Sequence, residues 1–188
     1  IYLPHFLSWI ILAGIMIDLL SPNGGLVNRF LGLFGAEPIF FLGSNKWFRF
    51  TLVFTDVWKE FGFGTIVYLA AITNIDPTQY EAATIDGANR FQRIMHVTLP
   101  NMRMIIVLMM VLSLGNVLNA GFDQVYNMYS EAVYSTGDIL DTFIYRLSFK
   151  NGLWGQSAAV SMFKSVVSTL FISVSYLCAY KFADYRVF

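Results

Sequence analysis

The sequence predicts an all-α integral membrane protein, a bundle of transmembrane helices with one polar helical segment held between two spans. Of the 188 residues, 56% are hydrophobic and only 13% are charged, about half the charged fraction of a typical soluble domain. Four apolar segments approach the roughly 20 residues that a membrane-spanning helix needs. A polar stretch at residues 76–100 separates the second segment from the third. Together these features favour a multi-pass membrane protein.

The expected spans are residues 4–20, 50–72, 102–122 and 157–180. The Ser-Pro-Asn-Gly-Gly run at residues 21–25 should end the first span. Residues 26–34 carry apolar side chains at helical spacing but are too few to cross, so we expect an interfacial helix there. Residues 123–156 are expected to form an outer loop. The chain begins with Ile1 instead of Met, and we expect further spans upstream in the intact protein.

The polar stretch should fold as a helix–turn–helix at the membrane surface. Asp76 can cap the free N–H groups of a helix, and Pro77 suits its first position. Gly87 should break the helix after Asp86, because glycine adopts positive φ at little cost. A second short helix is expected over residues 88–96, and Pro100 should open the next span. From these residues alone, a surface linker without a special task is also possible.

The second span contains Asp56, Lys59 and Glu60, and charge is costly in a bilayer. Asp56 and Lys59 are three residues apart, so a local ion pair could reduce that cost. One interpretation is that the span starts later and these groups lie in the interface. The other is that they face a water-filled passage.

Polar residues also follow one face of the third expected span. Asn116, Asn119 and Asp123 are spaced i, i+3 and i+7, and Ser113 extends the row. Such a row either bonds to a neighbouring helix or lines a passage. Two asparagines could donate to and accept from sugar hydroxyls, so we favour the passage.

The fourth expected span has a similar row of Ser157, Ser161, Lys164 and Ser168, at i, i+4, i+7 and i+11. Serines at this spacing usually permit close helix packing. Lys164 is less easily explained by packing, because it lies well inside the apolar run. Lys164 and Ser161 are therefore candidate pathway residues with Asn116, Asn119, Asp123, Asp56 and Lys59.

The sequence lacks the motifs typical of ATP binding, catalysis and metal binding. No G-x-x-x-x-G-K-[ST] loop is present, so we expect no P-loop binding of ATP by this chain. The two histidines, His5 and His96, are far apart, and the acids are scattered, so we expect no catalytic residues, metal site or cofactor. Zero formal net charge gives no indication of nucleic-acid binding. Two other classes of protein are alternatives: a membrane enzyme, and a channel or scaffold whose surface helix binds another protein.

The polar stretch resembles the signature of the inner-membrane permease subunits of ABC importers. The signature reads E-A-A, three residues, G, nine residues, I-x-L-P. The matching residues are Glu81, Ala82, Ala83, Gly87, Leu99 and Pro100. Val97 departs from the pattern, since the family usually has Ile there. Asp86-Gly87-Ala88 and Gln92 resemble the carbohydrate branch, and Gln124-Val125-Tyr126 resembles its polysaccharide-type members.

This resemblance implies a function and a set of partners. Residues 76–100 would contain the cytoplasmic coupling helix, which docks in a groove of an ABC ATPase subunit. A second permease subunit, identical or different, would complete the pathway, and an extracytoplasmic solute-binding protein would deliver a sugar or oligosaccharide. Residues 1–188 would be the C-terminal part of one permease domain in a bacterial or archaeal plasma (inner) membrane. For amino acids or peptides as the alternative substrates, Asp56, Lys59 and Lys164 would matter more than Asn116 and Asn119.

Overall fold

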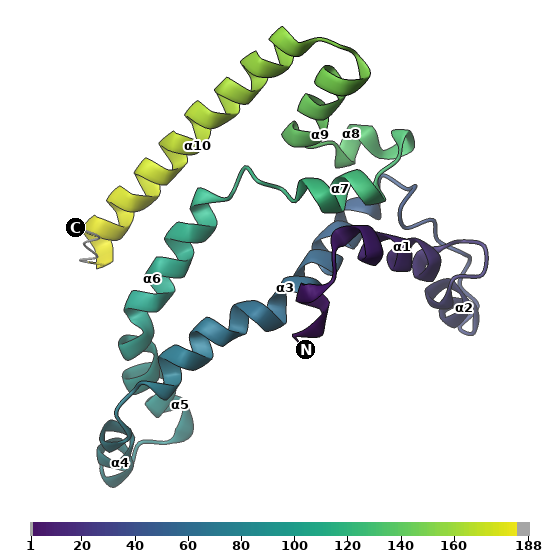
Figure 1. Ribbon diagram of the computed structural model, residues 1–188. Coiled ribbons are helices and arrows are strands. Elements are labelled where there is room, and N and C mark those ends of the chain that lie inside the picture. Colours follow the sequence, from purple (N-terminus) through teal and green to yellow (C-terminus); the bar gives the residue numbers. More distant parts are fainter. Residues whose placement is uncertain (1, 184–188) are drawn as a thin grey trace. The chain divides into compact units, whose positions relative to one another are not determined.

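The computed structural model describes residues 2–183, with the side chains of that range except those at 178, 179 and 181–183. Every regular element of these residues is a helix (Figure 1). The chain forms two compact units, which are described separately. Unit 1 contains the described residues of Ile1–Phe63 and Leu118–Lys164, and unit 2 those of Gly64–Val117 and Ser165–Phe188.

Unit 1 is built mostly from short helices, together with the first parts of two long helices. Its elements are the 3-10 helix η1 (Leu3–Phe6), α1 (Trp9–Leu20), α2 (Leu26–Gly32), the beginning of α3 (Phe48–Thr73), α7 (Phe122–Met128), η3 (Glu131–Val133), α8 (Tyr134–Gly137), α9 (Leu140–Tyr145), η4 (Arg146–Lys150) and the beginning of α10 (Trp154–Ala183). α1 packs against α2 and α7. The core of this unit joins Ala13, Leu42, Phe48, Met128 and Val133. Its apolar centre therefore combines α1 and α3 with segments that lie more than 60 residues later.

Unit 2 holds the polar stretch. It contains the rest of α3, then α4 (Pro77–Ile85), α5 (Arg90–Arg93), the π-helical turn η2 (Ile94–Thr98), α6 (Leu99–Gly115) and the rest of α10. α4 and η2 are in contact, and Figure 1 shows α4 and α5 as a hairpin between α3 and α6.

The expectation of one continuous helix over residues 4–20 is wrong. Leu7 is extended, and the Ser8 side chain accepts a hydrogen bond from the Ile11 N–H at 3.4 Å, so a new helix begins at Trp9. α1 has 12 residues, which is roughly 18 Å at 1.5 Å per residue, well short of a bilayer core of about 30 Å. The predicted interfacial helix does form as α2. Buried Asn28 fixes α2 by donating to the carbonyls of Leu20 and Ser21.

The third expected span also differs, because α6 ends at Gly115 instead of continuing to Phe122. Residues 116–121 are not helical, and Gly121 has φ +71° before α7 begins. Asn116, Asn119 and Asp123 therefore do not share a helix face. The expected outer loop at 123–156 is largely helical, since it contains α7, η3, α8, α9 and η4.

Pro100 lies in the first turn of α6, as predicted, but α6 continues from α5 and η2 without a break. Residues 90–115 form a single helix through α5, η2 and α6. The π-helical turn η2 ends at Thr98, two residues before Pro100. A proline has no N–H and crowds the preceding turn, and a local π-bulge accommodates that defect without ending the helix.

Two described helices are long and apolar enough to cross a membrane, Arg90–Gly115 and Trp154–Leu177. α3 has 26 residues and also matches the length of a span, although it includes Asp56, Lys59 and Glu60. α10 has 30 residues, so the fourth expected span at 157–180 lies within it.

Candidate functional site

The start and turn of the polar hairpin follow from local residue chemistry. Asp76 accepts a hydrogen bond from the Thr78 N–H at 2.9 Å, and Pro77 occupies the first turn of α4, both as predicted. The backbone hydrogen bond from Thr78 lowers the pKa of the Asp76 carboxyl below its ordinary value. Gly87 has φ +76°, and the Ala88 N–H donates to the Ala83 carbonyl at 2.9 Å. This is the left-handed helix ending that favours glycine.

A reciprocal cap starts the second half of the hairpin. The Asn89 side chain accepts from the Gln92 N–H at 2.9 Å, while the Gln92 side chain accepts from the Asn89 N–H at 2.8 Å. The cap satisfies two N–H groups that a helix start would otherwise leave unpaired. The chain is thus redirected within the few residues between α4 and α5.

Side chains then join the two halves of the hairpin. Three hydrogen bonds link Tyr80 Oη with Thr98 Oγ1 at 3.0 Å, Arg93 with Thr84 Oγ1 at 3.2 Å, and Asn101 with Gln79 Oε1 at 2.7 Å. Tyr80 and Thr84 lie one helical turn apart on the same side of α4. The bonds connect α4 to the long helix 90–115, so we expect the hairpin and that helix to move together.

The outer surface of this hairpin combines a carboxylate with uncovered apolar side chains. Ile85 is 86% exposed and Phe91 65% exposed, and Glu81 is also exposed. Glu81, Ile85 and Arg93 are among the residues that line a shallow cavity of about 340 Å³. We call the exposed surface of Glu81, Ile85 and Phe91 the hairpin face.

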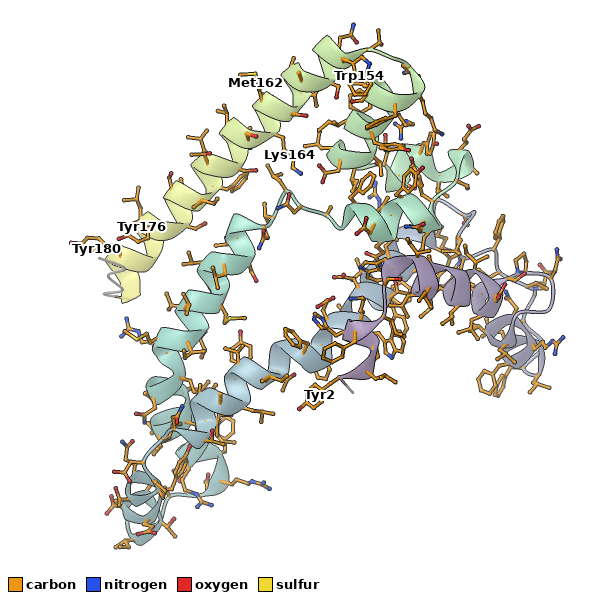
Figure 2. The ribbon with its side chains drawn as sticks, viewed as in Figure 1. Tyr2, Trp154, Met162, Lys164, Tyr176 and Tyr180 are labelled. Carbon is orange, nitrogen blue, oxygen red and sulfur yellow. The ribbon has the colours of Figure 1, made fainter. Side chains whose placement is uncertain are left out.

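Among the predicted pathway residues, Lys164 and Asn119 come together in unit 1. The Lys164 ammonium donates to Asn119 Oδ1 at 2.9 Å and to an Asp141 carboxylate oxygen at 2.6 Å. Figure 2 shows Lys164 pointing away from α10 toward the non-helical segment before α7. Lys164 therefore connects that segment to α9, and its charge is balanced within unit 1.

Lys59 takes part in a different cluster. It is 7% exposed, donates to the His5 carbonyl at 3.0 Å, and pairs with Glu60 at 2.9 Å. The Trp9 ring lies 5.4 Å from its ammonium. The ion pair of Lys59 is thus with Glu60, and the local pairing with Asp56 considered from the sequence is not the one that forms.

The other predicted pathway residues are dispersed. Asp56 and Asn119 line one cavity of unit 1. Asp123 is exposed on α7, and its carbonyl accepts from the Asn127 side chain at 2.7 Å. Ser161 lies partly buried on α10, and Asn116 belongs to unit 2. Across the described residues, no group of three or more His, Cys, Asp or Glu side chains could hold a metal ion.

An ion pair that the sequence did not indicate stabilises the segment between α8 and η4. Both guanidinium NH groups of Arg146 donate to the Asp138 carboxylate, at 2.8 and 2.5 Å, and Thr142 donates to it at 2.6 Å. Burial alone would raise the Asp138 pKa, but these hydrogen bonds outweigh burial, so the pKa lies below its ordinary value. Asp138 and Arg146 are eight residues apart on short, irregular helices, and this spacing is not one that predicts an ion pair from the sequence.

Replacing Asp138 with asparagine should lower the stability of the folded protein at pH 7 by about 1–2 kcal/mol, because a charged hydrogen-bonded pair is lost. A lowered folded-state pKa contributes stability that is complete above the unfolded value of about 3.9 and disappears as pH falls through the folded value. The deficit of Asp138→Asn should therefore shrink below about pH 4. Thermal unfolding in detergent between pH 7 and pH 3 measures this. A deficit independent of pH would contradict the assignment.

Comparison with known proteins adds a family and a fold. The family model described as binding-protein-dependent transport system inner membrane component matches residues 1–187. The polygalacturonan/rhamnogalacturonan transport system permease protein YteP of Bacillus subtilis (strain 168) is 38% identical over 188 residues, which cover 100% of this chain and 59% of YteP. Protein LplB of the same organism is 41% identical, with the same coverage. The chain thus spans about three fifths of the length of these relatives.

Two solved structures have closely similar folds. The first is the crystal structure of a bacterial ABC transporter involved in the import of the acidic polysaccharide alginate. It superposes with a TM-score of 0.94 at 38% identity, over 96% of this chain and 63% of the matched chain. The second is the bacterial alginate ABC transporter in complex with an alginate pentasaccharide-bound periplasmic protein. There the TM-score is 0.92 at 38% identity, over 96% and 62% of the chains.

Proposed function

Because the chain belongs to the family of binding-protein-dependent transport system inner membrane components, we propose that it acts as a permease subunit of an ATP-driven ABC importer. The fold is that of an importer permease, and the protein belongs in the plasma (inner) membrane. The bonded hairpin at residues 76–100 is the observation that carries this proposal. It is a compact polar element, joined to a long apolar helix, and it presents a charged and apolar surface.

In this proposal the hairpin transmits the motion of an ABC ATPase subunit. α4 lies in a groove of the ATPase, with the hairpin face covered by the partner. When ATP binding closes the ATPase dimer, each subunit displaces its hairpin, and the hydrogen bonds to the helix 90–115 carry the displacement into the membrane. The pathway then changes between inward-facing and outward-facing states. ATP hydrolysis occurs in the partner chain, and this chain performs no catalysis.

The residues of the signature have separate tasks in the docked state. Glu81 makes charge-assisted hydrogen bonds to the partner or to neighbouring backbone. Ala82 and Ala83 permit close approach, and Gly87, flanked by Asp86 and Ala88, provides the turn. Leu99 and Pro100 lie directly after the π-helical turn, where the hairpin becomes the membrane helix.

The transported solute is proposed to be an oligosaccharide. The names of YteP and of the alginate transporter refer to polysaccharide substrates, which supports this class. The proposed pathway residues remain Asn116, Asn119, Asp123, Asp56, Lys59, Ser161 and Lys164. Because Lys59 and Lys164 have carboxylate partners within unit 1, their charges serve first to position α3, α9 and α10. Asp56 and Asn119 are exposed and line one cavity of unit 1, so they are the better candidates for contact with hydroxyls. Asn119 Oδ1 also accepts the hydrogen bond from Lys164.

The proposed assembly contains two permease subunits, two ATPase subunits and an extracytoplasmic solute-binding protein. Its function is tested by uptake of labelled oligosaccharides into vesicles that contain the full-length permeases and ATPases, with the binding protein outside. We expect uptake that requires ATP inside the vesicle and the binding protein outside. Uptake that persists without ATP would instead indicate a channel.

A further inference from the structure

Unit 1 contains a cavity, lined by both charged and apolar residues, that extends beyond the predicted pathway residues. It has a volume of about 460 Å³, within the usual range of roughly 300–1,000 Å³ for small-ligand sites. Its walls are α3, the non-helical residues 119–121, α7, and the turn between α8 and α9. We call it the Arg49 cavity. All its lining residues belong to one compact unit.

α3 supplies one wall of the cavity, with a cation and a carboxylate on it. Arg49, Leu52, Val53 and Asp56 line the cavity, and their spacing of i, i+3, i+4 and i+7 places them on one helix face. Arg49 and Asp56 are therefore separated by about 10 Å along the helix axis, at 1.5 Å per residue. The wall presents a cation at one end, a carboxylate at the other, and an apolar surface between them.

The opposite wall is irregular backbone that is firmly held. Gln124 is 4% exposed, and its amide donates to the Leu52 carbonyl and to Thr55 Oγ1, both at 2.8 Å. These bonds attach α7 to α3. Within a membrane, backbone without helical hydrogen bonds is tolerated where it is covered by protein or lines a water-filled cavity. Residues 119–121 line such a cavity, and Asn119 adds a side-chain amide to it.

The charge balance identifies Arg49 as the cation available to a ligand. The Asp138 carboxylate also lines the cavity, but Arg146 binds it through two hydrogen bonds. Arg49 Nε donates to the Thr136 carbonyl at 2.8 Å, an uncharged acceptor that holds the guanidinium in place without neutralising it. The planar guanidinium is suited to binding a carboxylate through paired hydrogen bonds.

We propose that the Arg49 cavity binds a uronic-acid unit of the transported oligosaccharide, with Arg49 holding its carboxylate and Asp56 and Asn119 its hydroxyls. This inference rests on the proposed function as an oligosaccharide permease. The ammonium and carboxylate groups of a free amino acid are bonded to the same carbon atom, so they lie much closer together than the two ends of the α3 wall, which are about 10 Å apart. A free amino acid therefore matches the cavity less well. A sugar ring presents an anion on one side and hydroxyls on the other, above an apolar ring face.

The test compares an acidic sugar with its neutral counterpart. Affinities for a galacturonic-acid pentasaccharide, and for the same pentasaccharide with its carboxyl groups reduced to alcohols, are measured by calorimetry on the assembled full-length permease–ATPase complex. Arg49→Gln should weaken binding of the acidic sugar at least about tenfold, since a bidentate charged contact is lost, and should leave the reduced sugar nearly unchanged. Arg49→Lys should weaken binding of the acidic sugar by an intermediate amount, because lysine keeps the positive charge but cannot make the two parallel hydrogen bonds of a guanidinium.

Lys46→Gln is the matched control, because it removes an exposed cation three residues away that does not line the cavity. It should change neither affinity. Equal weakening of both sugars by Arg49→Gln would mean that Arg49 only supports the fold through Thr136, and no weakening would mean that the cavity is not the site. Either result overturns the inference. Vesicle uptake by the native complex distinguishes the failure of this inference from the failure of the proposed permease function. If uptake depends on ATP but Arg49→Gln weakens both sugars equally or neither of them, only the inference is wrong. If the native complex shows no ATP-dependent uptake, both are wrong.

Discussion

Replacing Gly87 with valine is expected to reduce ATP-driven uptake at least tenfold while the protein still inserts into the membrane. Gly87 has φ +76°. A residue with a Cβ makes this left-handed conformation less stable by about 1–2 kcal/mol, and a β-branched residue makes it less stable still. Every 1.4 kcal/mol is a factor of about ten in the population of the correct turn. No atom lies within 4 Å of the added Cβ, so the effect arises from backbone strain in the hairpin.

A second glycine supplies the control for this variant. Gly152 has φ +68° and equally open surroundings, but it lies in unit 1 between η4 and α10. Gly152→Val introduces similar strain without touching the hairpin and should retain most of the uptake. Gly87→Asn should also retain much of it, because asparagine tolerates the left-handed conformation. Normal uptake by Gly87→Val would contradict the role of the turn in coupling.

Replacing Gly137 with alanine is expected to lower the stability of the folded protein by about 1–3 kcal/mol, the usual cost of overpacking. An added Cβ would lie 2.1 Å from Phe48 Cε1. Phe48 is fully buried in the core of unit 1, so its ring has little room to move aside. Gly137 also lines the Arg49 cavity. Thermal unfolding in detergent should show a decrease of several degrees.

Gly14→Ala is the control variant: it is the same substitution, but at a position where we expect no loss of stability. Gly14 lies in α1 with no atom within 4 Å of an added Cβ, so alanine there should be neutral or stabilise by up to about 1 kcal/mol. Replacing the Phe48 ring with the smaller leucine side chain should restore part of the stability that Gly137→Ala loses, because the stability effects of mutations at contacting residues are not additive. If Gly137→Ala and Gly14→Ala melt at the same temperature, the close contact with Phe48 is wrong.

Local sequence chemistry was sufficient to predict the hairpin. Asp76 and Pro77 start α4, and Gly87 ends it, because capping and positive φ depend on neighbouring residues only. The uninterrupted helix through Pro100 was not predicted, because the sequence was judged from the proline alone. Proline usually marks a helix start, but a π-helical turn before it allows the helix to continue. The family signature identified the class of protein independently of these details.

Hydrophobic length alone was a poor guide to where helices stop. The apolar run at 4–20 includes Ser8, whose side chain caps a new helix at Trp9. The run to Phe122 contains Gly115 and Gly121, both available as stop signals, but the regular spacing of Asn116, Asn119 and Asp123 suggested a continuing helix. Periodicity therefore needs to be weighed against caps and glycines within the same window.

The contacts of the charged residues could not be derived from the sequence. Lys164 meets Asn119 and Asp141 across 45 and 23 residues of chain. Arg49 meets the Thr136 carbonyl across 87 residues. Such pairs depend on tertiary packing, and sequence spacing within one helix carries no information about them. Arg49 was accordingly absent from the predicted pathway residues, although it lines the same cavity as Asp56 and Asn119.

Co-purification of an ABC ATPase with the full-length permease tests the central claim most directly. The native protein is compared with a Glu81→Ala, Gly87→Val double variant and with a Glu37→Ala, Gly35→Val control. The control also removes an exposed glutamate and strains a glycine at φ +77° with open surroundings. We predict that the ATPase remains bound to the native protein and to the control and is lost from the hairpin variant. Equal retention by all three proteins, or no ATPase bound to the native form, would contradict the claim that residues 76–100 couple this permease to ATP.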